Sequence, residues 1–553
     1  MVVRRASIVR RAWWPATLRD ETSIVVSRVL RTVAASVAAM TCVVTVTVRT
    51  QTPAIGREVA VAHHLLHDEE LTLPLARLVA YGNALFTANW TDQDGGGRPL
   101  SKGTGSSLSD RAHPLNGRRS FNRISGPDAN ACNGCHNSPH AIAGGGGDVT
   151  TNTFEMAQRF DFVTFDRRDA KVTGGSVDEA ARRVSLTTVG NSRSTPGLFG
   201  AGYLEMLARQ ITRDLQRARD AVQPGQSRAL VSKGVSFGTL ARRANGTWDT
   251  RGVQGLSSTS LRTRTAADKP SLLVRPWQQS GTAVSLRDFT NTEFNRHLGI
   301  QTTERFGVNT DPDGDGVVNE MTRGDVTAVT MFIATLPVPG RVIPNDPEVE
   351  RAILAGERVF DRIGCVGCHV PALPLDQRGW IYSEPGPYNP PGTLRRTGAR
   401  VLDVDLTDPA LPQPRLHPSA GDAAVLLVPA YTDFKLHDIT DPADAAAKEP
   451  LDINEPPSSP GFTAGNRRFL TRRLWGAANE PPYFHHGLFT TMRQAVLAHA
   501  GEALNERQAF QRLEAPEQDA LVEFLKSLQV LPPGTKGLVV DEHHQPKVWP
   551  PPR

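Results

Sequence analysis

Two five-residue runs in this chain place two cysteines in a Cys-x-x-Cys pair and a histidine directly after the second cysteine. The runs are Cys132-Asn-Gly-Cys135-His136 and Cys365-Val-Gly-Cys368-His369, and they use four of the five cysteines in 553 residues. This spacing is the attachment signal for c-type haem, in which the thiols bond to the porphyrin edge and the histidine becomes an axial ligand of the iron. The sequence therefore predicts two covalently bound haem c groups.

Paired cysteines have other uses. Two such pairs can hold a structural zinc ion, and a single pair can act as a redox dithiol. Neither use explains why a histidine follows the second cysteine both times, and the two pairs lie 233 residues apart. Haem attachment is therefore the favoured interpretation.

The charge of the chain is unevenly distributed. Residues 1–62 hold nine arginines and three acids, a net charge of +6, so the remainder carries −1 of the total of +5. The basic character belongs to this leader, and nothing in the remainder favours nucleic-acid binding. With 39% hydrophobic and 22% charged residues, the composition is that of an ordinary globular protein, long enough for two or more domains.

The leader resembles an export signal. An apolar stretch at 32–48 follows a run of arginines that includes Arg4, Arg5, Arg10, Arg11, Arg28 and Arg31. A positive flank before a short apolar core predicts export, and haem c is normally attached outside the cytoplasmic membrane, so we expect a periplasmic protein. At 17 residues the stretch is marginal for a permanent span, so cleavage and retention as an inner-membrane anchor both stay open. Cys42, inside this stretch, is interpreted as a small apolar residue rather than a lipid-anchor site.

An internal repeat precedes the two motifs. A helix-like run at 348–362 and another at 75–85 each lead to a glycine and a phenylalanine four residues apart, on one helical face. The two pairs are Gly82/Phe86 and Gly356/Phe360. A second predicted helix opens at Pro516, and its apolar stripe includes Phe524. We expect one of two arrangements: either Gly356 closely approaches Phe524, or the helix that contains Phe524 packs elsewhere.

An acidic run lies between the two halves. Asp311, Asp313 and Asp315 alternate before Gly316, which resembles the start of a calcium loop. The twelfth position is a threonine, which excludes an EF-hand, although Glu320 is a substitute ligand. A calcium site and a solvated acidic turn both remain open.

Four further segments carry a family resemblance. They are Phe121–Cys132, Gly190–Glu205, Asp325-Val-Thr-Ala and Pro482-Tyr-Phe-His485-His-Gly487. Together with the two motifs they resemble the di-haem c-type oxidoreductases named putative peroxidases, a family distantly similar to bacterial di-haem cytochrome c peroxidase and to the di-haem enzyme that matures methylamine dehydrogenase. The resemblance covers residues 75–531.

The resemblance implies a mainly α fold, with two cytochrome c-like haem domains and long ordered loops. The expected parts are a leader or anchor (1–62), an N-terminal peroxidatic haem domain (63–300), a linker with the calcium loop (301–345), a C-terminal electron-transfer haem domain (346–531) and a Pro-rich tail (532–553).

The resemblance also suggests iron ligands. In the family a Tyr-x-His-x-Gly run precedes the second axial ligand of the C-terminal haem by fourteen residues from its histidine, and fourteen past His485 is His499. Methionine occupies this place in the peroxidases, so a His369/His499 haem is expected to have a lower potential. A helix-face histidine bonded to the backbone is the alternative. His437, earlier in the chain, is ambiguous, and His140 lies too close to His136 to reach the opposite haem face.

For the first haem, the resemblance points to Glu205 as the acid/base that moves a proton between the oxygens of peroxide. A glutamate that stabilises a helix start is the alternative. His297 is a candidate sixth ligand or gate, with an ordinary packed histidine as the alternative.

These features predict a periplasmic di-haem oxidoreductase that reduces hydrogen peroxide at the N-terminal haem. The C-terminal haem would relay electrons from a small cytochrome c or cupredoxin. Two alternatives remain: an electron carrier with both irons six-coordinate, and an oxygenase or modifier of a protein or polymer.

Overall fold

The computed structural model describes part of the chain. The described residues are 55–96, 129–139, 141–147, 149–152, 176–177, 183–184, 191–312, 314–419, 421–443, 448–449, 451–456 and 459–551. Most of the leader, Cys42, His140 and Asp313 lie outside them. Arg57–Arg553 form one compact unit.

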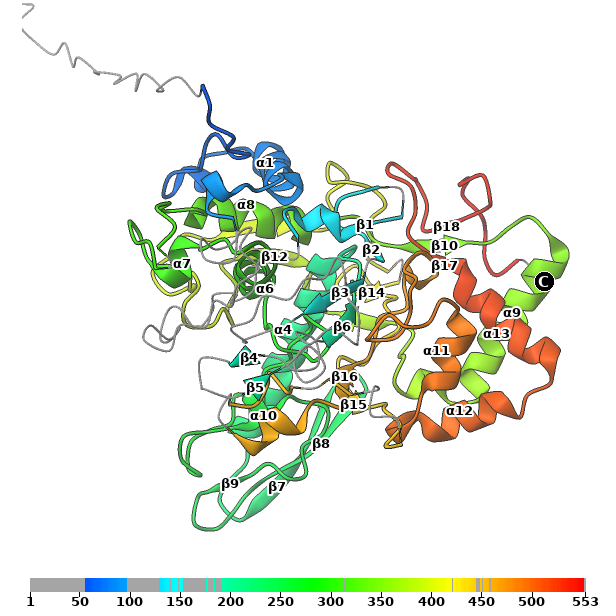
Figure 1. The fold of residues 1–553 in the computed structure, drawn as a ribbon. Coiled ribbons are helices and arrows are strands. Elements are labelled where there is room, and N and C mark those ends of the chain that lie inside the picture. Colours follow the sequence, from blue (N-terminus) through cyan, green and yellow to red (C-terminus); the bar gives the residue numbers. More distant parts are fainter. Residues whose placement is uncertain are drawn as a thin grey trace, which may run out of the picture. The chain divides into compact units, whose positions relative to one another are not determined.

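Two pairs of helices frame the two motifs (Figure 1). In the first pair α1 (Leu75–Thr87) packs on α8 (Arg323–Ala334), and in the second α9 (Pro347–Arg362) packs on α13 (Ala515–Ser527). Each Cys-x-x-Cys pair begins a single 3-10 turn beside its helix pair, η4 (Cys132–Gly134) and η6 (Cys365–Gly367). The repeat expected from the sequence is therefore present in three dimensions.

Local sequence starts these helices. Asp346 accepts hydrogen bonds from the amides of Glu348 and Val349, and Pro347 occupies the first turn of α9. At the start of α8, Thr322 and Asp325 form a reciprocal capping box. Both caps satisfy amide groups that the helix itself leaves unpaired.

A glycine lies at the crossing point of each helix pair. A Cβ atom on Gly356 would lie 2.0 Å from the carbonyl oxygen of Ala520 and 2.8 Å from Cβ of Phe524. On Gly82 it would lie 2.0 Å from the carbonyl oxygen of Ala328 and 2.9 Å from Cβ of Phe332. The close approach of Gly356 to Phe524 is thus present, and the first pair repeats it.

Several further helices occur in the described residues. They are α4 (Ala201–Asp220), α5 (Ser258–Leu261), α6 (Leu286–Glu293), the π-helical turn η5 (Phe294–Leu298), α7 (Thr303–Phe306), α10 (Pro460–Ala464), α11 (Met492–Ala498) and α12 (Leu504–Gln511). Short 3-10 turns occur at Glu69–Leu71, Asp92–Asp94, Ala477–Asn479 and Gly501–Ala503. Within the described residues no helix combines the length and apolarity needed to cross a bilayer.

Short strands make up several small sheets. The sheets in the first half are β1 (His136–Ser138) with β2 (Gly146–Gly147), β3 (Val149–Asn152) with β6 (Asn191–Ser194), β4 (Ser176–Val177) with β5 (Arg183–Val184), and β7 (Gln226–Ser232), β8 (Val235–Arg242) and β9 (Trp248–Asp249) in that order. Those in the second half are β11 (Leu373–Leu375) with β14 (Leu426–Val428), β12 (Ile381–Glu384) with β13 (Leu402–Asp405), and β15 (Leu436–Asp438) with β16 (Arg468–Leu470). The last sheet places β10 (Gly340–Val342) between β17 (Leu528–Gln529) and β18 (Val539–Val540).

The expectation of a mainly α fold is wrong. Among the described residues only 32% are helical and 15% lie in strands. The second half, expected as a mainly helical domain with long loops, contains antiparallel pairs such as β11–β14, whose partners are more than 50 residues apart, as in Leu373 and Val428. Strands of three or four residues with distant partners leave little periodic signal in the sequence, because pairing depends on neighbours that only the folded chain supplies.

The buried core joins segments from both halves. The larger cluster includes Leu78, Leu207 and Val329 together with Leu375 and Trp475, while a smaller cluster around Phe360 and Phe524 surrounds the second motif. The interval 301–345, expected as a linker, contains the almost wholly buried helix α8. The boundaries of the two haem domains stay a prediction.

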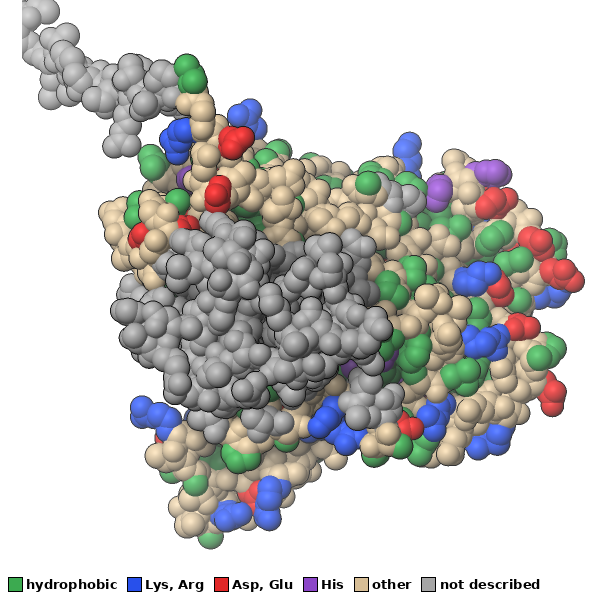
Figure 2. Space-filling view, viewed as in Figure 1, with side chains coloured by type: hydrophobic (Ala, Val, Ile, Leu, Met, Phe, Trp, Pro, Cys, Tyr) green, Lys and Arg blue, Asp and Glu red, His purple; other side chains and the backbone are tan. Residues whose placement is uncertain are grey.

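The visible surface over α9 and α13 carries basic and acidic side chains side by side (Figure 2). Several form ion pairs, including Arg362 with Glu517 at 2.5 Å and Lys526 with Glu523 at 2.6 Å. Neither sign dominates this part of the face.

Gly356→Ala is expected to destabilise the protein, although alanine favours a helix interior by roughly 1 kcal/mol over glycine. The added methyl group meets main-chain atoms that cannot rotate away, and overpacking of this kind costs about 1–3 kcal/mol or more. The loss is measured as the free energy of unfolding of the haem-loaded protein.

Gly421→Ala is the matched control, because a Cβ atom at Gly421 has nothing within 4 Å. Equal stability of the two variants would contradict the assigned helix crossing.

Candidate haem sites

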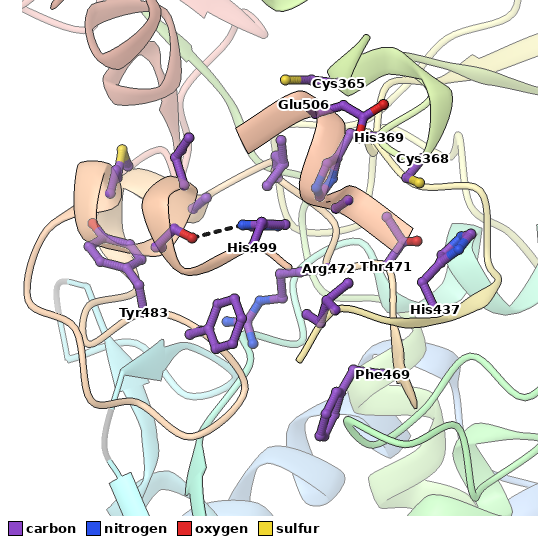
Figure 3. A pocket seen from close by; sticks show the side chains of 18 of the residues that line it. Cys365, Cys368, His369, His437, Phe469, Thr471, Arg472, Tyr483, His499 and Glu506 are labelled. Carbon is purple, nitrogen blue, oxygen red and sulfur yellow. Dashed lines mark hydrogen bonds between the residues drawn. The ribbon is translucent and has the colours of Figure 1, made fainter. Parts of the chain in front are cut away.

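Each motif lines a cavity, and the cavity at the second motif is the larger of these two. Its volume is about 240 Å3, and its lining includes Cys365, Cys368, His369, Phe360 and His499. These side chains come from α9, η6 and the end of α11, and Figure 3 shows His369 and His499 extending into the same space. The wall is mostly apolar, as a porphyrin requires.

His369 and His499 are spaced as two axial ligands of one iron would be. Their ring centres lie 6.5 Å apart. With metal–nitrogen bonds of about 2 Å on each side, two axial imidazoles have ring centres roughly 6 Å apart. The 65° angle between the ring planes is compatible with this arrangement, because both planes can contain the same axis.

In both His369 and His499, the Nδ1 atom forms a hydrogen bond that fixes the orientation of the imidazole ring. Nδ1 of His499 lies 2.7 Å from the carbonyl oxygen of Ala495, and Nδ1 of His369 lies 3.2 Å from that of Tyr431. A carbonyl oxygen can only accept, so each Nδ1 carries the proton and donates it, and each Nε2 is left with a lone pair for a metal. His499 thus bonds to the backbone, as one alternative expected, and lies beside His369, while its role as an iron ligand stays a prediction.

Both histidines are neutral at ordinary pH. Burial lowers the pKa of His369 to about 4, with the neighbouring His499 acting in the same direction. Burial also lowers the pKa of His499, against the opposing hydrogen bond to Ala495. Neutral imidazole is the form that binds metal.

At the first motif, His136 has the same kind of hydrogen bond and the same lowered pKa as His369. Nδ1 of His136 donates to the carbonyl oxygen of Gly145 at 2.9 Å, and burial lowers the His136 pKa to about 4. The ring centres of His136 and Phe86 lie 6.0 Å apart, close to the 6.3 Å between those of His369 and Phe360. The described residues enclose a cavity of about 60 Å3 here, lined by both cysteines and His136.

A carboxylate and an imidazole line the first cavity beside His136. Nε2 of His297 lies 2.7 Å from Oε2 of Glu293, one helical turn earlier, and both side chains are largely buried. Gln278 also donates to Glu293. Burial raises the Glu293 pKa, but the hydrogen bond and charge of His297 outweigh it, so the pKa lies below its ordinary value.

Sequence reasoning found His297 but missed Glu293. The available signal was their spacing of four residues, which places both on one face of a helix. That spacing alone does not distinguish a solvated ion pair from one that faces a cavity.

Glu205 has a different position from the one expected. It is fully buried on α4 and accepts hydrogen bonds from Arg209 and from the amide of Leu286, the latter at 2.6 Å. Arg209 also lies 3.9 Å from Glu384, so Glu205 is part of a buried ion-pair cluster. It does not line the cavity at His136 among the described residues. Burial raises its pKa, which Arg209 opposes.

The acidic run is not brought together as a cation site in the described residues. Asp311 accepts hydrogen bonds from the amides of Gly314, Asp315 and Gly316, and Glu320 accepts one from Gln301. These bonds describe an acidic turn. With Asp313 outside the described residues, calcium binding stays an untested prediction.

His437 lies at the edge of the second cavity. Its nitrogens lie 2.9 Å from Asp433 and 2.8 Å from Glu502, and Cys368, Asp433 and His437 are close enough to share a metal ion. A cysteine bonded to porphyrin no longer offers a thiolate, so haem attachment and a metal ion here exclude one another. Both nitrogens of His437 thus lie within hydrogen-bond distance of carboxylates, beside Cys368.

One family model matches part of the second half of the chain. Residues 425–528, which hold His437, His485 and His499, match the family described as "Di-haem oxidoreductase, putative peroxidase". The resemblance recognised in the sequence is confirmed, and haem is the cofactor that the family's description implies.

A solved structure of hydrazine synthase from Kuenenia stuttgartiensis, pressurized with xenon, is also similar. Its TM-score is 0.24 and its identity 16%, over 51% of this chain and 73% of that chain, values too low to carry an argument. No curated protein matches the chain.

The second site fits a haem. One face of the cavity offers His369, the opposite face His499, and the two cysteines lie at one edge. His499→Met is expected to raise the midpoint potential of this haem on the order of 100 mV, because a thioether favours ferrous iron. Spectroelectrochemical titration measures the shift.

The exposed His417 provides the control, since His417→Met changes the same side chain outside both cavities. An unchanged potential in His499→Met would exclude His499 as an iron ligand.

Proposed function

We propose that this protein is an exported di-haem oxidoreductase that reduces hydrogen peroxide to water at the first haem. Electrons would enter from a small cytochrome c or cupredoxin and pass through the second haem. Cys132 and Cys135 would attach the first haem and Cys365 and Cys368 the second, with His136, His369 and His499 as iron ligands.

One asymmetry carries this proposal. The second site offers a histidine on each side of an iron, whose coordination would then be complete. At the first site the described residues offer His136 together with the Glu293–His297 pair, in which Nε2 of His297 is directed at the carboxylate. A site that offers an iron one histidine ligand, with an acid–base pair nearby, suits a haem that binds and converts a substrate.

The bound haem would supply an iron that binds peroxide and passes it electrons. Reduction of hydrogen peroxide to two waters consumes two electrons and two protons. Glu293, with its lowered pKa, is a carboxylate able to accept a proton from the inner oxygen, and its partner His297 is able to hold one. Glu293 therefore replaces Glu205 as the proposed proton-transferring group, since Glu205 is not among the described residues that line this cavity.

Binding of an exogenous ligand tests the open site. Cyanide is expected to bind one of the two haems, the one attached to Cys132 and Cys135, and to perturb its absorption and spin-resonance spectra. If neither haem binds cyanide in any oxidation state, the protein is an electron carrier and the peroxidase proposal fails. Oxygen uptake on a polymer without peroxide turnover would instead indicate an oxygenase.

Glu293→Gln is expected to lower peroxide turnover with a reduced cytochrome by about 10²–10⁴-fold, because the amide cannot accept the proton. Cyanide binding should persist, since the amide keeps the shape of the side chain. The pH dependence of turnover should also lose its acidic limb.

Glu205→Gln is the matched comparison, in a carboxylate that is buried but lies outside the cavity lining. It is expected to affect stability more than the proton-transfer step. Full turnover in Glu293→Gln, with a large loss in Glu205→Gln, would reverse the assignment.

A further inference from the structure

Residues 219–269, which we call the arm, differ in charge from the rest of the protein. They hold nine basic and three acidic residues, a net charge of +6 (9 − 3). Residues 63–553 as a whole carry −1, so those outside the arm carry −7 (−1 − 6). A concentration of charge of this kind governs association with charged partners rather than the fold.

The arm is a three-stranded sheet that is anchored at one end. β7 pairs with β8 and β8 with β9, and Figure 1 shows the three strands extending to the bottom of the view. Phe237 on β8 is buried in the larger core cluster, and Lys233 in the β7–β8 turn reaches Gln210 of α4 at 2.6 Å. The segment after β9 returns along the opposite end, where the amide of Trp248 donates to the carbonyl oxygen of Ala266. That opposite end is the tip of the arm.

The tip presents its cations to solvent. The side chain of Arg251 is 83% exposed. Arg228 and Arg264 are also exposed, and among the described residues neither forms an ion pair. Arg243 and Arg251 share the single carboxylate of Asp249. The carboxylates of the arm therefore neutralise only part of its positive charge.

The base of the arm lies against the wall of the second cavity. The amide of Leu436 donates to the carbonyl oxygen of Gly255 at 2.9 Å, and the next residue, His437, lines that cavity. Along β8, from Gly238 to Arg243 at the tip, five residues of extended chain cover roughly 17 Å. A folded partner of about 100 residues has a radius of gyration of ~13 Å, so it can contact the tip and the cavity wall together.

The arm lacks the exposed apolar side chains of a membrane-inserting surface, which combines basic residues with Trp, Phe or Leu. Val231 is the exposed large hydrophobic side chain within residues 219–269, and it lies beside the anchored turn, away from the tip. A second copy of this chain offers no clear match on the face shown in Figure 2, because acidic and basic side chains are mixed there over α9 and α13. A separate acidic protein is the partner that fits the arm best.

We propose that the arm is the docking surface for the electron donor, and that this donor is a small soluble protein with an acidic face around its redox metal. The proposal rests on the proposed function, since it names the partner that supplies the second haem. In each encounter one electron passes from the reduced donor to the second haem, so the donor metal is oxidised and the haem iron is reduced. Two encounters deliver the two electrons that one hydrogen peroxide consumes.

Stopped-flow reduction of the oxidised di-haem protein, in the absence of peroxide, tests the docking surface. The acidic probe is reduced plastocyanin, and the basic probe is reduced mitochondrial cytochrome c. Plastocyanin should reduce the second haem with a rate constant that falls about 10-fold or more as the ionic strength rises from ~10 to ~150 mM, because salt screens the attraction. The basic cytochrome should react slowly at low salt and faster as salt screens the repulsion.

The triple variant Arg228→Glu/Arg251→Glu/Arg264→Glu reverses three exposed charges of the arm. It should slow reduction by plastocyanin at low salt about 10–100-fold and abolish the salt dependence. Both midpoint potentials should stay unchanged, because none of the three arginines lines either cavity. The triple glutamine variant at the same positions removes the charges without adding repulsion, and its rate constant should lie between those of the wild type and the reversal.

Arg395→Glu/Arg396→Glu/Arg400→Glu is the control with the same change in net charge. These arginines are exposed and follow Leu394, whose amide donates to a glutamate of α7, and Figure 1 places α7 away from β7, β8 and β9. Reduction by plastocyanin should slow much less than in the arm variant, since steering depends on the charge around the docking surface.

Equal losses in the arm and control variants, or faster reduction by the basic cytochrome at low salt, would overturn the proposal. Salt-sensitive self-association measured by sedimentation, or binding to phosphatidylglycerol vesicles, would also overturn it if the arm variant lost that binding, because the arm would then have a different partner. Electron entry from plastocyanin without any turnover of peroxide would instead remove the proposed function and leave the docking surface in place.

Discussion

The close crossing of two helices at a glycine is the constraint on which both candidate haem sites depend. At Gly82 and at Gly356 the main chain of the partner helix occupies the space of a Cβ atom. Because the helices touch there, Phe86 and Phe360 reach the histidine of the neighbouring motif. The same contact therefore sets the distance between each helix pair and its haem-attachment turn. Dense packing makes such a contact intolerant of even one methyl group.

Main-chain carbonyl groups then decide which nitrogen of each histidine would be available to an iron. His136, His369 and His499 all donate from Nδ1 to the backbone, and burial keeps the rings neutral by lowering their pKa values. The sites differ in what lies beyond these ligands. The ring centre of His499 lies 6.5 Å from that of His369 in the second cavity, whereas the Glu293–His297 pair lines the first. Under the proposed function, this difference would separate a site for electron transfer from a site for chemistry.

Many of the candidate site residues could be predicted from local sequence patterns, whereas the sheets could not. The two Cys-x-x-Cys-His runs, the glycine–phenylalanine repeat and the position of His499 are all visible as spacings along the chain. The pairing of β11 with β14 depends on contacts between residues more than 50 positions apart. Glu205 and Glu293 show the same limit of prediction from the sequence, because both are glutamates of helices in the first half. Only the fold places Glu205 in a buried ion-pair cluster and Glu293 in the lining of a cavity.

The sequence by itself indicated the cofactor class and the helices that precede the two motifs, and it predicted two attachment sites, because these features depend on covalent chemistry and on spacing within a few turns. The tertiary structure alone decided which carboxylate lines the first cavity and which distant segments pair as short sheets. These features depend on burial and on pairing between distant parts of the chain, and neither is encoded in the distance between neighbouring residues.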